Sequence, residues 1–257
     1  MPILAYHMVE PRFDLAITRV TPPQFARQIR TLLQAGYAIM PLRTYLQSVD
    51  SQEKRVALTF DDAYASVYKH AWPVLAAHRL SATLFVPAGY VGKMDDWDVN
   101  LCGLSFPHMT QDQICELAGA GWEIGSHSLY HRDLTRMGAE QRLEELEGSK
   151  RLLEAMTGTT IDAISYPFGN TNAAVVDCCK RAGYRSGVVM GRFNIALEVN
   201  YVLPRLGVYL YDSPLLFEKK VFGKHEKLFN FIQRGIDFCS DGTVLVKQGF
   251  RKPRKSA

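Results

Sequence analysis

An alternation of short apolar runs with longer amphipathic segments restricts the fold of this chain more than any other feature. Several of the runs are almost continuously hydrophobic, as expected of parallel strands that are covered on both faces. Strands are predicted at residues 3–6, 56–60, 82–86, 123–125, 163–166, 187–189 and 206–209.

Segments with helical periodicity fill the intervals between these runs, and several of them end just before a glycine. Helices are predicted at residues 21–35, 66–78, 110–120, 139–156, 172–182 and 217–235. A β-α alternation over about 210 residues predicts a parallel sheet, and either a barrel or a doubly wound open sheet fits the pattern. In both folds, ligands gather at the carboxyl ends of the strands.

Composition narrows the class of protein. With 257 residues, of which 47% are hydrophobic, the chain can bury a core of real size. No apolar run approaches the roughly 18 residues that span a bilayer, and the first residues lack a signal-peptide pattern. Five cysteines in no framework spacing agree with a reducing compartment. We therefore expect a cytoplasmic protein with no stable membrane insertion.

The last part of the chain has a different charge balance from the rest. Residues 217–257 are rich in Lys and Arg, whereas the remainder is close to neutral. A basic end on a near-neutral body does not indicate nucleic-acid binding. We expect a barrel domain over residues 1–215 and a C-terminal helical extension with a basic tail over residues 216–257.

Two adjacent carboxylates, Asp61 and Asp62, follow the apolar run at 56–60. Their charges repel each other, and burying them costs several kcal/mol unless something compensates. One interpretation is that Asp62 caps the next helix, which requires only one aspartate. The other is that a cation sits at the strand end, bound by one carboxylate while the second stays free.

A pair of histidines, His127 and His131, follows the strand predicted at 123–125. On a helical turn, a spacing of four places both imidazoles on one face, close enough to share a metal. Taken alone, the pattern fits two exposed helix histidines equally well. Because the pair shares a predicted layer with Asp61 and Asp62, it completes the two-histidine, one-carboxylate ligand set of catalytic zinc. The remaining aspartate can then accept a proton.

Three short motifs resemble those of the NodB-type polysaccharide deacetylases, carbohydrate esterase family 4. T-F-D-D (59–62) is similar to the first motif of the family, H-S-L-Y-H (127–131) to the second and S-Y-P-F-G (165–169) to the third. The motifs occur in the family order, and the similarity covers roughly residues 1–210. The resemblance implies a deformed (β/α)7 barrel of the NodB homology domain, similar to a TIM barrel.

The resemblance also implies an activity and a site. The chain would be a metal-dependent hydrolase of carbon–nitrogen bonds other than peptide bonds, removing N-acetyl groups from an amino sugar in a polysaccharide, oligosaccharide or lipid-linked glycan. A divalent ion, usually Zn²⁺, would be bound by Asp62, His127 and His131. Asp61 would be the general base, and the backbone N–H of Phe168 would bind the acetyl oxygen in the transition state.

Two departures from the family pattern concern the base and the acid. Ser165 stands where many members have an arginine that orients the base, and Arg205 is the replacement candidate, or else an ordinary structural ion-pair residue. No late motif with an acid histidine is visible. L-A-Y-H-M-V (4–9), however, resembles the opening of a circularly permuted subgroup that includes the poly-N-acetylglucosamine deacetylases. We therefore expect His7 to be the general acid.

Other functions on the same scaffold stay open at this point. Related barrels include deformylases of lipid-linked sugars and other amidohydrolases. A degenerate barrel that only binds glycans is the non-enzymatic alternative, and it would require a missing ligand or base. The sequence contains all three candidate ligands and the candidate base.

Overall fold

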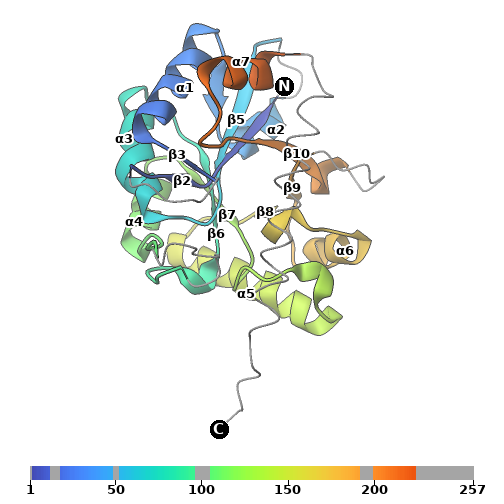
Figure 1. The fold of residues 1–257 in the computed structure, drawn as a ribbon. Coiled ribbons are helices and arrows are strands. Elements are labelled where there is room, and N and C mark those ends of the chain that lie inside the picture. The colour runs from blue at the N-terminus through green and yellow to red at the C-terminus, as the bar shows by residue number, and fades with distance from the viewer. Residues whose placement is uncertain (1, 12–17, 49–51, 96–104, 192–198, 224–257) are drawn as a thin grey trace.

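The computed structural model describes residues 2–11, 18–48, 52–95, 105–191 and 199–223. Within these residues, seven parallel strands form a closed ring (Figure 1). Their order is β1 (Ile3–Tyr6), β10 (Leu203–Gly207), β9 (Ser186–Met190), β8 (Ala163–Ser165), β7 (Glu123–Ser126), β6 (Thr83–Val86) and β5 (Arg55–Phe60). Pairing of β1 with β5 closes the ring. The predicted (β/α)7 barrel is confirmed, and the open doubly wound sheet is excluded.

All seven predicted strands are present, and the largest shift in position is at β10. The prediction was residues 206–209, whereas the strand is Leu203–Gly207. Pro204 and Arg205 hide this strand in the sequence, because proline lacks an N–H and arginine interrupts the apolar run. Three short strands were not predicted: β2 (Met8–Val9), β3 (Arg19–Val20) and β4 (Ala38–Met40). Two or three residues are too few to show a periodic pattern.

The helices surround the ring (Figure 1). Those predicted at 21–35, 110–120, 139–156 and 172–182 keep close to their predicted bounds, whereas the helix Leu42–Gln47 was not predicted. They are α1 (Pro22–Gln34), α2 (Leu42–Gln47), α3 (Trp72–Ala77), α4 (Gln111–Gly119), α5 (Ala139–Thr157), α6 (Ala173–Arg181) and α7 (Pro214–Phe222). The helix predicted at 66–78 begins instead with a π-helical turn, Val67–Ala71. Pro73 explains this turn, since it lacks the N–H of an α-helical bond and its ring crowds the carbonyl four residues earlier.

The C-terminal extension is only partly described. Helix α7 overlaps the start of the helix predicted at 217–235, and residues 224–257 lie outside the described residues. The division into a barrel over 1–215 and an extension over 216–257 stays a prediction. In the part of the chain that is described, no helix is long and apolar enough to cross a membrane.

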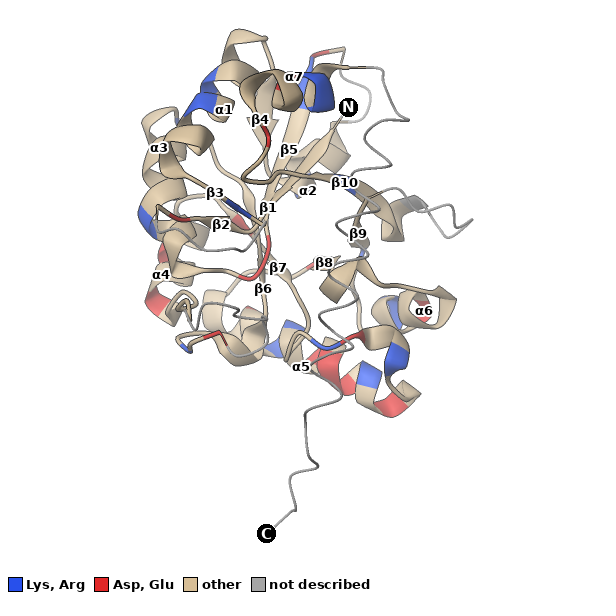
Figure 2. Ribbon diagram, in the orientation of Figure 1, with Lys and Arg blue, Asp and Glu red and all other residues tan. Residues whose placement is uncertain are grey.

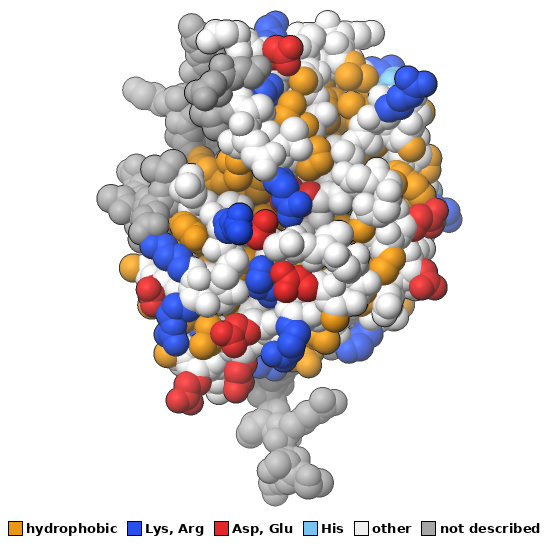
Figure 3. Space-filling model, turned by 180° about the vertical axis from the view of Figure 1, so that it is seen from behind, with side chains coloured by type: hydrophobic (Ala, Val, Ile, Leu, Met, Phe, Trp, Pro, Cys, Tyr) orange, Lys and Arg blue, Asp and Glu red, His pale blue; other side chains and the backbone are white. Residues whose placement is uncertain are grey.

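Charged residues are spread over the outer helices, most densely on α5 (Figure 2). Seen from behind, the surface carries Lys and Arg interspersed with Asp and Glu (Figure 3). That face therefore has no patch of a single sign.

The strands separate two apolar regions by the alternation of their side chains. Alternate residues such as Leu4, Leu58 and Ile124 belong to the large core beneath the helices. The intervening residues form a small cluster inside the ring: Ile3, Ala57, Phe85, Ala163 and Val188, with Leu42 of α2.

The same alternation determines which polar residues face the inside of the ring. Residues two or four positions beyond a member of the inner cluster face the same side, as do residues two positions beyond Leu203 on β10 and Gly125 on β7. The polar residues found in this way are His7, Asp61, His127, Ser165 and Arg205. Because the strands are parallel, four of these residues lie at or just beyond carboxyl ends, and Arg205 lies in the middle of β10. The barrel thus gathers them at one end of its interior.

Candidate active site

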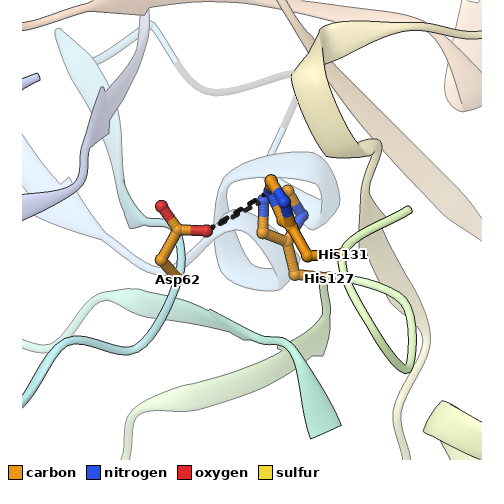
Figure 4. Close-up of side chains that lie close together, drawn as sticks. All are labelled: Asp62, His127 and His131. Atoms are coloured by element: carbon orange, nitrogen blue, oxygen red, sulfur yellow. Dashed lines mark ion pairs between the residues drawn. The ribbon is translucent and has the colours of Figure 1, made fainter. Parts of the chain in front are cut away.

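Asp62, His127 and His131 converge at the carboxyl end of the barrel (Figure 4). All three are buried, and Oδ1 of Asp62 lies 3.4 Å from Nε2 of His127 and 3.5 Å from Nε2 of His131. These separations are long for hydrogen bonds. They match the spacing of ligand atoms around a tetrahedral ion, because two ligand atoms each about 2.1 Å from its centre lie about 3.4 Å apart. Among the described residues, no other three His, Cys, Asp or Glu side chains form such a group.

The protonation of the two histidines suits a metal ligand. Nδ1 of His127 lies 2.7 Å from the backbone oxygen of Ser165, to which it donates, so the lone pair is on Nε2. Burial lowers the pKa of His127. The pKa of His131 is well below its ordinary value, mainly because the ring is buried and secondly because His127 is near. Both rings are therefore neutral at neutral pH, as metal binding requires.

A tight turn brings the two histidines together. The prediction of a helical turn, made from their spacing, is therefore wrong. Residues 128–130 form the turn after β7, and Ser128 and His131 have left-handed φ values of 61° and 50°. The aspartate loop has similar geometry, with φ values of 67° at Asp62 and 51° at Ala63. Non-glycine residues hold such conformations only where their surroundings enforce them, commonly at functional sites.

The structure contradicts the interpretation that Asp62 caps the next helix. The residue before the π-helical turn is Ser66, and no side chain caps it. The backbone oxygen of Asp62 instead accepts a hydrogen bond from Nδ1 of His108 at 2.6 Å. The His108 ring is buried and stacks on Tyr64 with 5.0 Å between ring centroids. Sequence reasoning found no role for His108, since no pattern links it to the aspartates.

Asp61 and Arg205 form a fully buried, two-pronged ion pair. Nη1 of Arg205 donates to Oδ1 of Asp61 at 2.7 Å, and Nη2 donates to Oδ2 at 2.6 Å. The Ser165 hydroxyl also donates to Oδ2, at 3.0 Å. Burial raises the pKa of Asp61, but the charge and hydrogen bonds of Arg205 outweigh it, so the net pKa is well below the ordinary value. Asp61 is therefore ionised throughout the physiological range.

His7 lies just after β1 and faces the same interior. Its side chain is partly buried, and among the described residues its Nδ1 has no hydrogen-bond partner. Burial is the main cause that lowers the pKa of His7, to a net value of about 4; Asp61 opposes it, and Arg205 and His127 act in the same direction as burial. The backbone N–H of Asp61 donates to the backbone oxygen of Tyr6 at 2.9 Å, so His7, the next residue, lies in the same cluster.

Phe168 lies in a single 3₁₀ turn, Pro167–Gly169, which begins two residues after the end of β8. Its backbone is left-handed, with a φ of 59°, and its ring meets the His131 ring edge-on with centroids 4.7 Å apart. The structure thus brings together every residue that the sequence proposed for the site: His7, Asp61, Asp62, His127, His131, Phe168 and Arg205.

The fold and this site define the class of protein: a NodB-like barrel of the carbohydrate esterase type. Residues 48–187 match the family model described as polysaccharide deacetylase, which is more than half of the chain. The chain belongs to this family, and the resemblance seen in its motifs is confirmed.

Relatives with assigned names agree with this membership. The chain is 31% identical over 192 residues to the putative polysaccharide deacetylase YxkH of Bacillus subtilis, an alignment that covers 73% of this chain and 63% of YxkH. It is 24% identical over 224 residues to the poly-β-1,6-N-acetyl-D-glucosamine N-deacetylase of Staphylococcus aureus, covering 81% of this chain and 73% of that protein. The chain thus spans less than two thirds of the length of YxkH.

Solved structures with the same fold include polysaccharide deacetylase BC0361 of Bacillus cereus, with a TM-score of 0.73 and 23% identity over 86% of this chain and 68% of that one. IcaB of Ammonifex degensii gives a TM-score of 0.70 at 22% identity, over 86% of this chain and 95% of that one. At these identities the likeness shows the fold alone.

Proposed function

We propose that the protein is a metal-dependent hydrolase that removes N-acetyl groups from an amino sugar within a glycan. The observation that carries the proposal is the convergence of Asp62, His127 and His131 beside the ion-paired Asp61, in a chain of the polysaccharide deacetylase family. The substrate class follows the S. aureus relative, whose name specifies β-1,6-linked N-acetylglucosamine.

A divalent ion fits the three ligand atoms, and Zn²⁺ is the proposed ion because two imidazoles and one carboxylate are its usual catalytic ligands. When bound there, the ion supplies Lewis acidity toward the water and the acetyl group. Asp62, His127 and His131 would hold it, with Ser165 fixing the orientation of His127 through its backbone oxygen.

Asp61 is the proposed general base. Its Oδ2 accepts hydrogen bonds from both Arg205 and Ser165, whereas Oδ1 accepts one from Arg205 within the described residues. Oδ1 is therefore the proposed acceptor of the proton that water loses as it attacks the acetamide carbon. Arg205 keeps the carboxylate charged and fixes its orientation. In this role Arg205 would replace the arginine that the third motif of many family members contains.

The other two residues act on the substrate as the carbon–nitrogen bond breaks. The backbone N–H of Phe168 is proposed to donate to the oxygen that becomes negative, an interaction worth about 3–4 kcal/mol in comparable sites. That negative charge also favours a proton on His7, whose pKa is low in the resting protein. His7 takes up this proton from solvent and donates it to the leaving nitrogen, while Asp61 returns the proton taken from water to solvent, which gives acetate and a free amine.

We also propose a cytoplasmic location, on the basis of the cysteines. Within the described residues Cys115, Cys178 and Cys179 are free thiols, and the last two are buried. Such thiols fit a reducing compartment.

The proposal is tested by acetate release. The Zn²⁺-loaded protein is incubated with β-1,6- and β-1,4-linked N-acetylglucosamine oligomers and with N-formyl analogues. We expect acetate from at least one acetylated oligomer, loss of the activity after chelation, and recovery with added Zn²⁺. Bound Zn²⁺ without acetate from any amino sugar would contradict the proposal, and formate release alone would favour a deformylase.

A further inference from the structure

One face of helix α5 is docked on the turn that carries His131. Three residues on that face, Glu145, Gly148 and Ser149, are spaced as neighbours on a helix surface. The Ser149 hydroxyl lies 2.8 Å from that of Ser126, the last residue of β7. A Cβ atom on Gly148 would stand 3.3 Å from the side chain of Leu129, so the glycine permits the close approach.

Glu145 makes the most specific contacts on this face. Its Oε2 accepts hydrogen bonds from the backbone N–H groups of Leu129 at 3.0 Å and Tyr130 at 2.9 Å. The other oxygen lies 3.6 Å from Nη1 of Arg132. The Glu145 side chain is only 4% exposed, so this carboxylate interacts with the turn and hardly contacts solvent.

The two histidine ligands depend on this turn to different degrees. His127 directly follows β7, its N–H donates to the backbone oxygen of Val86, and its ring is held by the Ser165 oxygen. His131 comes four residues later, beyond a turn that includes left-handed Ser128, and is itself left-handed. Its distance from Asp62 (Figure 4) is thus determined by the shape of a strained turn.

We propose that Glu145 is a positioning residue for the metal centre, acting through the turn to place His131 against Asp62 and His127. The inference rests on the proposed metal-dependent function. Without the carboxylate, the N–H groups of half-buried Leu129 and exposed Tyr130 lose the acceptor that holds the turn against α5. The turn is then free to move, and His131 moves with it.

A second buried glutamate provides a matched control. Glu123 lies at the amino end of β7, and its Oε2 also accepts two hydrogen bonds, from the Arg43 N–H and the Thr83 hydroxyl, both at 2.8 Å. Replacing it removes the same chemistry from the opposite end of the barrel. A general loss of packing or stability would affect both positions, whereas a metal-specific effect would appear only at Glu145.

The test compares Glu145→Leu, Glu145→Gln and Glu123→Leu with the wild-type protein. Zn²⁺ affinity is measured by competition with a chromophoric chelator, at a temperature where all four are folded. We expect Glu145→Leu to weaken Zn²⁺ binding about 10- to 100-fold. Glu145→Gln retains a carbonyl oxygen that can accept both N–H groups, so we expect it to stay within about threefold of wild type. Glu123→Leu should lower the melting temperature and leave the affinity within about threefold.

Two readouts independent of activity accompany the affinities. Hydrogen exchange of the Leu129 and Tyr130 amides in the metal-free protein should accelerate in Glu145→Leu and not in Glu145→Gln. The visible absorption of Co²⁺ in the site should change in Glu145→Leu alone, because it reports the ligand geometry.

Two outcomes would count against the inference, and they are distinguishable. Wild-type Zn²⁺ affinity in folded Glu145→Leu would overturn the inference and leave the proposed function standing. Failure of the wild-type protein to bind Zn²⁺ or Co²⁺ would overturn the proposed function and this inference with it.

Discussion

The two ends of the barrel each contain a buried carboxylate, and the two behave in opposite ways. At the amino end, burial raises the pKa of Glu123, and the hydrogen bonds from Arg43 and Thr83 offset only part of the effect. At the carboxyl end, the pKa of Asp61 is lowered although burial alone would raise it. Burial alone therefore does not determine whether the pKa of a carboxylate is raised or lowered in this protein.

The arginine beside each carboxylate accounts for the difference. Arg43 is 41% exposed, and its Nε lies 3.8 Å from Glu123, so solvent screens the pair. Arg205 is fully buried and meets Asp61 with two hydrogen bonds at 2.6 and 2.7 Å. Charge-assisted, two-pronged pairing in a low-dielectric interior is the arrangement that keeps a buried carboxylate ionised.

Strained backbone conformations also differ between the amino and carboxyl ends of the barrel. Five of the six non-glycine residues with positive φ in the described chain lie in loops at the carboxyl end: Asp62, Ala63, Ser128, His131 and Phe168. The sixth is Arg79, just beyond α3. The carboxyl end thus concentrates strained geometry as well as charge, as expected of a functional site.

Removal of a ligand should have the greatest effect at the carboxyl end. We expect His127→Ala to lose both Zn²⁺ and activity, with a rate at least about 10⁴-fold lower, because two ligands cannot hold the ion in place. Metal content by atomic emission and acetate release measure the two losses. His78→Ala, at an exposed histidine just after α3, is the control and should change neither.

Replacement of the base should separate turnover from metal binding. Asp61→Asn is expected to retain Zn²⁺ and to lower kcat about 10²- to 10⁴-fold, since Asn cannot accept the proton. Metal content and steady-state kinetics on the folded variant measure this. A near-normal rate would show that the base assignment to Asp61 is wrong.

Arg205→Met should make the surroundings of Asp61 resemble those of Glu123, a buried carboxylate whose neighbouring arginine is not buried. Asp61 would be left as a buried charge without its partner, at a cost of about 3–5 kcal/mol in unfolding free energy near neutral pH. Burial would then raise the pKa of Asp61, and the acidic limb of the rate profile would move to higher pH. Urea unfolding at several pH values, together with kcat/KM, tests this. An unchanged acidic limb would exclude Arg205 as the group that keeps Asp61 ionised.

A smaller effect is expected from His7, through the pH dependence of stability. Its pKa is about 4 in the folded protein and about 6.5 when unfolded, so the unfolded state binds the proton more readily between these values. Metal-free wild type should therefore lose stability as the pH falls from about 6.5 towards 4. In His7→Gln the loss between pH 7 and pH 5 should be smaller by about 1–2 kcal/mol. Equal losses in both proteins would contradict the lowered pKa.

Local patterns in the sequence determined most of the fold and most of the candidate site. The strands at 56–60 and 123–125 could be predicted because hydrophobic periodicity is a property of consecutive residues. Asp61, Asp62, His127 and His131 could be predicted because each follows such a strand, and parallel strands align their carboxyl ends. The same local reasoning gave the wrong geometry for residues 127–131, because a spacing of four fits a turn as well as a helix.

Only the tertiary structure decided how distant residues meet. The pairing of β1 with β5 closes the ring, and ring closure brings Arg205 to Asp61 across 144 positions of sequence. His108 on Asp62 and Glu145 on the histidine turn likewise depend on where loops and helices pack. No periodic pattern encodes such contacts, because they arise from the arrangement of whole elements around the barrel.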